Sequence, residues 1–126
     1  MKRIFIDANI LIEILMSRRL ANNCVLMLQD ASRQYTISAL TVHIVWYIAE
    51  KYSIDQKLVD EILTGWEILP ITQDIIKSAR ERYDGKDFED CLQAVCAEVG
   101  DCESIITIDK QFQQHSSTNL SVILIQ

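Results

Sequence analysis

Five short apolar runs, separated by longer segments with helical periodicity, constrain the fold of this chain more than any other feature. The runs lack the polar alternation of a strand with one face in water, so we predict strands that are buried on both faces. In chain order the predicted strands are Ile4–Ile6, Tyr35–Ile37, Glu67–Pro70, Ser104–Thr107 and Val122–Ile125. Strands of this kind occur in parallel sheets whose two faces are covered by helices.

Apolar residues recur at helical spacing between these runs, and the pattern predicts six helices. They span about residues 8–16, 20–32, 38–52, 55–64, 72–83 and 87–99. Ser38 and either Thr72 or Asp74 are suitable N-cap residues. Gly65 is a stop signal for the fourth helix, and Asp84-Gly85 predicts a turn. We therefore expect an α/β domain in which a parallel sheet carries helices on both faces.

Length and charge limit the domain organisation and the partners. The chain has 126 residues, which suits one domain over residues 1–126 and is too short for two. Twelve Lys and Arg residues against eighteen Asp and Glu residues give a net charge of −6. This balance excludes a general basic surface that holds nucleic acid by neutralising its phosphates. Any contact with nucleic acid must be local or assisted by a metal ion.

The sequence predicts a soluble, cytoplasmic protein. Its start imitates a signal peptide, but Asp7 and Glu13 interrupt the apolar run and no small-residue cleavage site follows. Even the longest uncharged stretches, such as Gln34–Ala49, are shorter than the roughly 20 residues of a membrane-spanning helix. The cysteines form no Cys-x-x-Cys pair, so we expect buried thiols in a reducing cytosol, with a zinc site as the alternative. They are Cys24, Cys91, Cys96 and Cys102.

Carboxylates fall where a parallel sheet would bring them together. Asp7 directly follows the first predicted strand, and Asp109 lies two residues beyond Thr107 at the end of the fourth. Asp90 lies near the start of the helix that precedes the fourth strand, one turn after Asp87. Open parallel sheets bind their ligands beyond the carboxyl ends of the strands. We therefore expect three chain segments to deliver acids to one crevice.

Carboxylates gathered in this way need a positive charge nearby. Two unit charges about 4 Å apart repel by about 4 kcal/mol at an effective dielectric constant of about 20. Oxygen ligands without nearby histidine or cysteine favour hard ions such as Mg²⁺ or Mn²⁺, which also bind substrate phosphates. Such an ion makes a water more acidic and offsets negative charge on a phosphodiester. The pattern thus favours metal-dependent attack on a phosphodiester. Through its bound ions an acidic protein could contact RNA.

These acids also have simpler interpretations. Asp7 or Asp109 alone could be a turn residue at the end of a strand. Asp87 is suited to be an N-cap with Asp90 at the third helical position, which is the arrangement of a capping box. Glu89 is expected to point elsewhere around the helix and to be solvated surface.

Four blocks of the sequence resemble the PIN domain family, and they occur in the family's order. The blocks are Phe5–Leu11, Ile37–Thr41, Asp87–Ala94 and Ile105–Phe112. The resemblance covers nearly the whole chain, whose length is similar to that of a stand-alone VapC-like ribonuclease, the toxin of a type II toxin–antitoxin system. It implies a three-layer α/β/α fold with a parallel sheet of about five strands. It also implies a metal-dependent endoribonuclease site built from acids.

The resemblance assigns a role to each matching residue. Asp7, Asp90 and Asp109 match the first, third and fourth acids of the family's site. Asp7 and Asp90 would hold a Mg²⁺ or Mn²⁺ ion directly, and Asp109 would hold it through water or help to hold a second ion. Asp87 fits a subgroup in which this block has the pattern Asp-x-Glu-Asp. The polar residues that would support the site are Asn9, Asp87 and Thr107.

The sequence departs from the family pattern at the second acid. Counting from Ser38, the matching position is Ile44, with His43 before it. Some PIN subgroups carry Asn instead of Glu there, but Ile offers no oxygen to a metal ion. Three acids can still bind one ion, whereas a second ion loses a ligand. Glu13, on the first predicted helix, is the only other nearby acid that could substitute.

The leading hypothesis is an endoribonuclease, the toxin of a toxin–antitoxin pair, silenced by a small antitoxin protein whose basic tail reaches the acidic site. The resemblance also implies a homodimer, and the apolar stretch His43–Tyr47 offers packing or partner contacts. One alternative, motivated by Ile44 and the net charge of −6, is a PIN fold without catalysis that binds a basic protein or RNA. Another is a different α/β hydrolase or phosphotransfer domain, for which the sequence has no Gly-rich phosphate loop or nucleophile elbow.

Overall fold

The computed structural model describes residues 1–112 and 119–126 and confirms the alternation of strands and helices. The strands are β1 (Lys2–Ile6), β2 (Arg33–Ser38), β3 (Glu67–Leu69), β4 (Ser104–Thr107) and β5 (Ser121–Leu124). The helices are α1 (Ala8–Leu15), α2 (Ala21–Met27), α3 (Ala39–Lys51), α4 (Gln56–Leu63), α5 (Gln73–Arg82) and α6 (Phe88–Val99). Within the described residues, none of these helices combines the length and apolar character needed to cross a bilayer.

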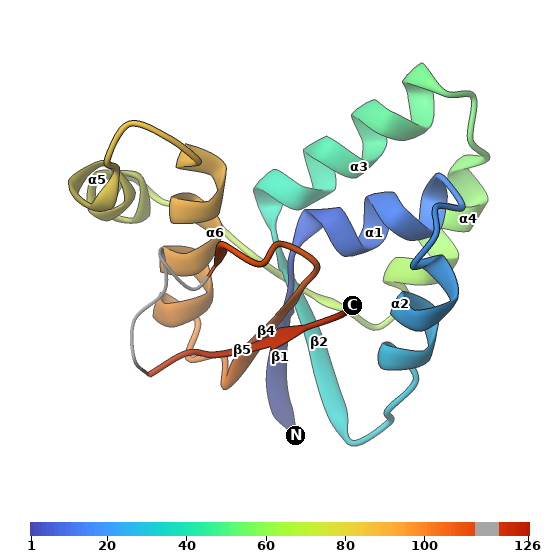
Figure 1. The fold of residues 1–126 in the computed structure, drawn as a ribbon, viewed down its shortest axis with the longest axis horizontal. Coiled ribbons are helices and arrows are strands. Elements are labelled where there is room, and N and C mark those ends of the chain that lie inside the picture. The colour runs from blue at the N-terminus through green and yellow to red at the C-terminus, as the bar shows by residue number, and fades with distance from the viewer. Residues whose placement is uncertain (113–118) are drawn as a thin grey trace.

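The strands form one sheet in the order β3-β2-β1-β4-β5, and every neighbouring pair is parallel. Figure 1 shows α1 to α4 on one side of this sheet and α5 and α6 on the other. The expected three-layer α/β/α fold with a parallel sheet of five strands is therefore confirmed.

The central strand β1 shows why its apolar run is unbroken. Ile4 and Ile6 pack into the core beneath α1 to α4, whereas Phe5 packs into the core beneath α5 and α6. Successive side chains of a strand point to opposite faces, so a strand covered on both sides needs apolar residues at every position. Both cores depend on this short segment.

The strand order reverses direction at β1. The chain moves from β1 to β2 and β3 on one side, and then returns to place β4 and β5 on the other. The edge beyond the carboxyl ends of β1 and β4 is where open parallel sheets bind their ligands, and we refer to this edge as the crevice. The backbone N–H of Asp7 donates to the carbonyl oxygen of Ile106 at 3.0 Å, so Asp7 lies at this edge, between β1 and β4.

Two of the expected helix ends need correction. The second helix ends at Met27 rather than near Ser32. The carboxylate of Asp30 accepts hydrogen bonds from both the backbone N–H and the hydroxyl of Ser32, and such local bonds stabilise a turn in place of a helix. Asp87 does occupy the N-cap position of α6, but its backbone is left-handed (φ 59°, ψ 47°) and its side chain makes no capping hydrogen bond.

Other terminal signals are confirmed. The hydroxyls of Ser38 and Thr72 accept the backbone N–H groups of Thr41 and Ile75, each at 3.2 Å. Gly65 follows the end of α4 with φ of +81°, a conformation that costs glycine little.

All four cysteines are buried thiols that form no disulfide, as expected. Burial raises the pKa of the Cys96 thiol to about 12 and those of Cys24 and Cys102 to about 11. Thiols with such pKa values are poor nucleophiles and poor zinc ligands at neutral pH.

A buried polar bridge joins α6 to the junction of β2 and α3. Ser38 Oγ donates to Gln93 Oε1 at 2.7 Å, and Gln93 Nε2 donates to Thr41 Oγ1 at 2.8 Å. All three side chains are fully buried. Gln93 lies one turn after Asp90, so the bridge fixes how the first turns of α6 sit over the sheet.

Removing the Gln93 amide should destabilise the fold. The variant Gln93→Ala leaves the hydroxyls of Ser38 and Thr41 without their amide partner and opens a cavity, so the free energy of unfolding should fall by about 2 to 4 kcal/mol. Urea denaturation measures this change. The exposed Gln56 at the start of α4 is the control, because Gln56→Ala should shift stability by no more than about 0.5 kcal/mol. Equal effects of the two substitutions would contradict the bridge's role.

Candidate metal centre

Asp7 is a buried carboxylate in the crevice. It lies directly after β1 as the N-cap residue of α1, with extended backbone (φ −67°, ψ 144°) and no side-chain capping bond. Only 1% of the residue is exposed. Because its side chain does not cap the helix, its carboxylate is available to face the crevice.

Thr107 holds this carboxylate in place. Its hydroxyl donates to Asp7 Oδ2 at 2.8 Å and accepts both Asn9 Nδ2 at 3.2 Å and the backbone N–H of Asp109 at 3.0 Å. One donor and two acceptor positions complete the capacity of a hydroxyl group. Thr107 therefore connects β1, α1 and the segment after β4, with Asn9 and Asp109 as direct neighbours.

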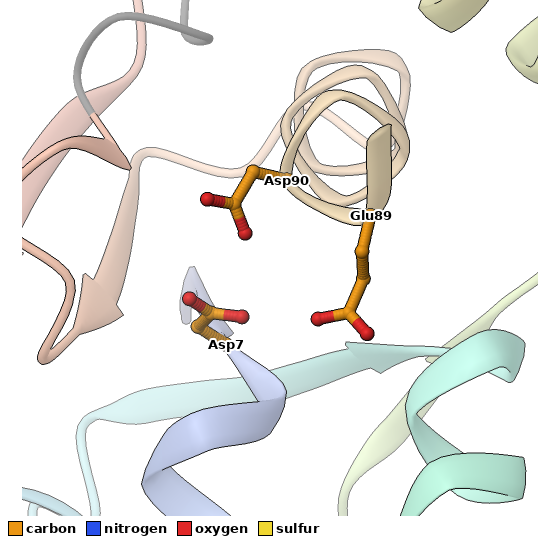
Figure 2. Close-up of side chains that lie close together, drawn as sticks. All are labelled: Asp7, Glu89 and Asp90. Atoms are coloured by element: carbon orange, nitrogen blue, oxygen red, sulfur yellow. The ribbon is translucent and has the colours of Figure 1, made fainter. Parts of the chain in front are cut away.

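The start of α6 brings two further carboxylates to Asp7. One oxygen each of Asp7, Glu89 and Asp90 lie within 4.8 Å of one another. Figure 2 shows Glu89 and Asp90 approaching Asp7 from different sides. We refer to these three residues as the acid cluster.

The position of Glu89 corrects the expectation that it points away as solvated surface. Residues 89 and 90 are neighbours in the first turn of α6, and Asp7 lies between the directions of their side chains (Figure 2). The residue as a whole is exposed, but the longer glutamate chain bends its carboxylate inward. The sequence signal that could have indicated this is the Asp-x-Glu-Asp block itself, in which a glutamate precedes the aligned acid.

Asp109 joins the cluster through Asp90. Its backbone N–H is held by Thr107, its Oδ1 accepts the backbone N–H of Gln111 at 2.9 Å, and its proximity raises the pKa of Asp90. The structure thus brings Asp7, Asp90 and Asp109 to one crevice. It places Asp87 at the edge of this group, where the Asp87 charge adds to the field at Asp90.

The cluster is strained electrostatically without a cation. The pKa of Asp7 is raised to about 6, and burial is the largest cause. The charges of Glu89 and Asp109 also raise this pKa, and the hydrogen bond from Thr107 lowers it. Burial also raises the pKa of Asp90 to about 8, helped by its hydrogen bond to Asp109 and by neighbouring carboxylates. Among the described residues, no Lys, Arg or His side chain forms an ion pair with the acid cluster. Every neighbouring charge that shifts these pKa values is negative.

Glu13 does not substitute for a missing acid. Its carboxylate is buried and accepts the backbone N–H of Leu20 at 2.8 Å, which ties the end of α1 to the start of α2. Its role in the structure is to satisfy a backbone donor. Ile44, on α3, is half-buried and belongs to neither hydrophobic core.

Comparison with known proteins agrees with this architecture. The sequence matches the PIN domain family over residues 4–117. It matches no curated protein at a significant level.

Three solved structures are similar over most of their length. A toxin–antitoxin complex from Klebsiella pneumoniae contains a chain with 26% identity and a TM-score of 0.69, covering 92% of this chain and 93% of that one. VapBC2 from Rickettsia felis, bound to a promoter DNA fragment, gives 17% identity and a TM-score of 0.69 over 98% and 99% of the chains. VapC20 of Mycobacterium tuberculosis is a toxin that cleaves the sarcin–ricin loop. It has 14% identity and a TM-score of 0.72, covering 87% of this chain and 92% of that one.

The family match spans most of the chain, and the fold of these solved structures recurs here. The protein belongs to the PIN domain family.

Proposed function

We propose that this protein is a metal-dependent endoribonuclease and the toxin of a toxin–antitoxin pair. The observation that carries the proposal is the acid cluster, whose carboxylates lie within 4.8 Å of one another without a cationic neighbour among the described residues. Membership of the PIN family and the likeness to a toxin–antitoxin chain from Klebsiella pneumoniae support it. Its four cysteines, none of them in a disulfide, fit a cytoplasmic location, where thiols stay reduced and RNA is present.

The donor set fits a hard divalent ion such as Mg²⁺ or Mn²⁺. All available ligand atoms are carboxylate oxygens, and the buried cysteines are absent from the cluster. Asp7 and Asp90 would hold the ion directly, with Asp109 holding it through water or helping a second ion. Thr107 and Asn9 would keep the Asp7 carboxylate oriented through their hydrogen bonds. When bound, such an ion supplies a more acidic water and offsets negative charge on the phosphodiester.

The charge of the protein supports a cation at the point of RNA contact. A net charge of −6 repels RNA over most of the surface, and the acid cluster alone would repel a phosphate most strongly. A bound divalent ion reverses the sign of the local field. RNA binding at this crevice should therefore depend on the metal, and removal of the ion should abolish substrate binding as well as cleavage.

A protein partner would silence the site. The similar chain from Klebsiella pneumoniae is part of a toxin–antitoxin complex. We propose a small antitoxin whose basic tail enters the acidic crevice, because a cationic side chain could take the place of the metal's charge.

Ile44 favours a second candidate function, a protein- or RNA-binding module without catalysis. It places an apolar side chain on α3 at the position where the family pattern has an acid. The two candidates differ in one measurable respect, which is metal-dependent cleavage.

The endoribonuclease proposal predicts discrete cuts in a mixed pool of cellular RNA. Purified protein with Mn²⁺ or Mg²⁺ should cleave, and EDTA should stop it. The variant Asp90→Asn should lower the cleavage rate by at least about 100-fold, because it removes a metal-binding charge. Asp60→Asn, on the exposed face of α4, is the matched control and should cleave normally. A folded wild-type protein that does not cut would exclude catalysis and favour the binding module.

The raised carboxylate pKa values predict an unusual pH dependence of stability. The folded-state pKa values of Asp7 and Asp90, about 6 and about 8, exceed the ordinary value near 4, so the native state binds protons that the unfolded state does not. The metal-free protein should therefore lose stability as the pH rises from about 4 to about 8, with Asp7 alone contributing on the order of 3 kcal/mol, most of it between about pH 4 and pH 6.

Melting temperatures in EDTA across this range measure the effect. Asp7→Asn should flatten the dependence, whereas Asp60→Asn should not. Mn²⁺ should restore stability at the upper end of the range, because metal ions bind the deprotonated carboxylates. A melting temperature that stays constant or increases with pH in EDTA would contradict the assignment.

We also propose a homodimer that uses the exposed face of α3. Tyr47 is 55% exposed and His43 is exposed one turn before it. Aromatic residues of this kind are enriched at interfaces. Light scattering should give twice the chain mass of 14.5 kDa, and Tyr47→Asp should reduce it to one chain. A wild-type mass near 14.5 kDa at micromolar concentration would rule out a stable dimer.

A further inference from the structure

We propose that Glu89 is a metal ligand of the acid cluster and supplies from α6 the carboxylate that α3 lacks at Ile44. This inference rests on the proposed metal site, which it deepens by assigning a residue outside the three acids that match the family pattern. The argument comes from the placement of Glu89 relative to Asp7 and Asp90.

The spacing of the three carboxylates suits one ion. Two oxygens that each lie about 2.1 Å from the same Mg²⁺ or Mn²⁺ ion are at most about 4.2 Å apart. The oxygens of Asp7, Glu89 and Asp90 already lie within 4.8 Å of one another. Small rotations of the two α6 side chains would therefore bring all three oxygens to coordination distance, without movement of the backbone.

The orientation of Glu89 is not explained by its place in a helix. The dipole of α6 favours a carboxylate in the first turn, but it does so for any direction around that turn. A solvated glutamate would lower its energy by turning away from two other acids. Instead the carboxylate faces inward, with one oxygen within 4.8 Å of an oxygen of Asp7 and of Asp90. An ion held between the acids would offset this cost.

Glu89 covers the side of Asp7 on which α3 begins. The sheet has β1 between β2 and β4, and Asp109 follows β4. Figure 2 shows the Glu89 carboxylate near the end of β2, where the chain turns into α3, whereas Asp90 lies toward β4. The buried bridge from Gln93 to Ser38 and Thr41 fixes this part of α6 against the same junction. Ile44 is half-buried and belongs to neither core, so its replacement removes no member of either core.

Calorimetric titration with Mn²⁺ alone tests the inference without relying on activity. Glu89→Gln should weaken Mn²⁺ binding by at least about tenfold, the size of effect expected for a lost charged ligand. The matched control is Glu81→Gln on the exposed surface of α5, which should bind as the wild type does. Melting in EDTA provides the folding check, because Glu89→Gln removes a repelling charge and should be no less stable than the wild type.

A second variant tests whether Glu89 on α6 takes the place of an acid at position 44 on α3. Ile44→Glu, added to Glu89→Gln, should restore Mn²⁺ affinity to within about threefold of the wild type, whereas Ile44→Gln in the same background should not. If Ile44→Glu does not restore Mn²⁺ affinity to the Glu89→Gln variant, the claim that Glu89 takes the place of an α3 acid is overturned.

The outcomes separate this inference from the proposed function. A wild-type protein that binds no Mn²⁺ would overturn both. A second outcome would overturn the role of Glu89 alone. In it the wild type and Glu89→Gln bind Mn²⁺ equally well, whereas Asp90→Asn does not bind it. Loss of binding in both variants, with normal binding by Glu81→Gln, is the result we expect.

Discussion

The parallel pairing of β1 with β4 is the constraint on which the rest of this structure depends. It joins segments about a hundred residues apart and leaves Asp7 and Thr107 side by side in the crevice, where the hydroxyl of Thr107 bonds the carboxylate of Asp7 at 2.8 Å. The pairing is held by two hydrophobic cores, since Phe5 and Ile105 face one while Ile6 and Ile106 face the other. The cores thus supply the free energy that keeps a buried carboxylate in place against its desolvation.

The acid cluster is the part of the molecule that works against stability. Burial and repulsion raise the pKa values of Asp7 and Asp90, so the metal-free protein keeps protons at pH values where exposed carboxylates have lost them. The surrounding polar groups are arranged to hold this geometry. Thr107 fixes Asp7, and the Gln93 bridge fixes the helix that carries Glu89 and Asp90. A divalent ion would offset the repulsion and desolvation of these carboxylates, and its binding would stabilise the folded state.

The sequence predicted the order of the elements well because a strand buried on both faces has an unbroken apolar run, as in Ile4–Ile6. It also predicted that Asp7, Asp90 and Asp109 would meet, because strand ends and helix starts share one edge of a parallel sheet. It could not predict the direction of the Glu89 side chain or the partners of Gln93, since both depend on how α6 packs against the distant β2–α3 junction. The early end of α2 depends on a local bond between Asp30 and Ser32 that competes with the helix.

The most direct test of the account is a crystal structure of the protein soaked in Mn²⁺, with data collected for the anomalous signal of manganese. The account predicts a peak between Asp7 and Asp90, about 2.2 Å from an oxygen of each, and with an oxygen of Glu89 in the same coordination sphere. A cluster that remains free of metal at a Mn²⁺ concentration that saturates other binding sites, or one whose charge is neutralised by a basic side chain of the protein itself, would contradict it.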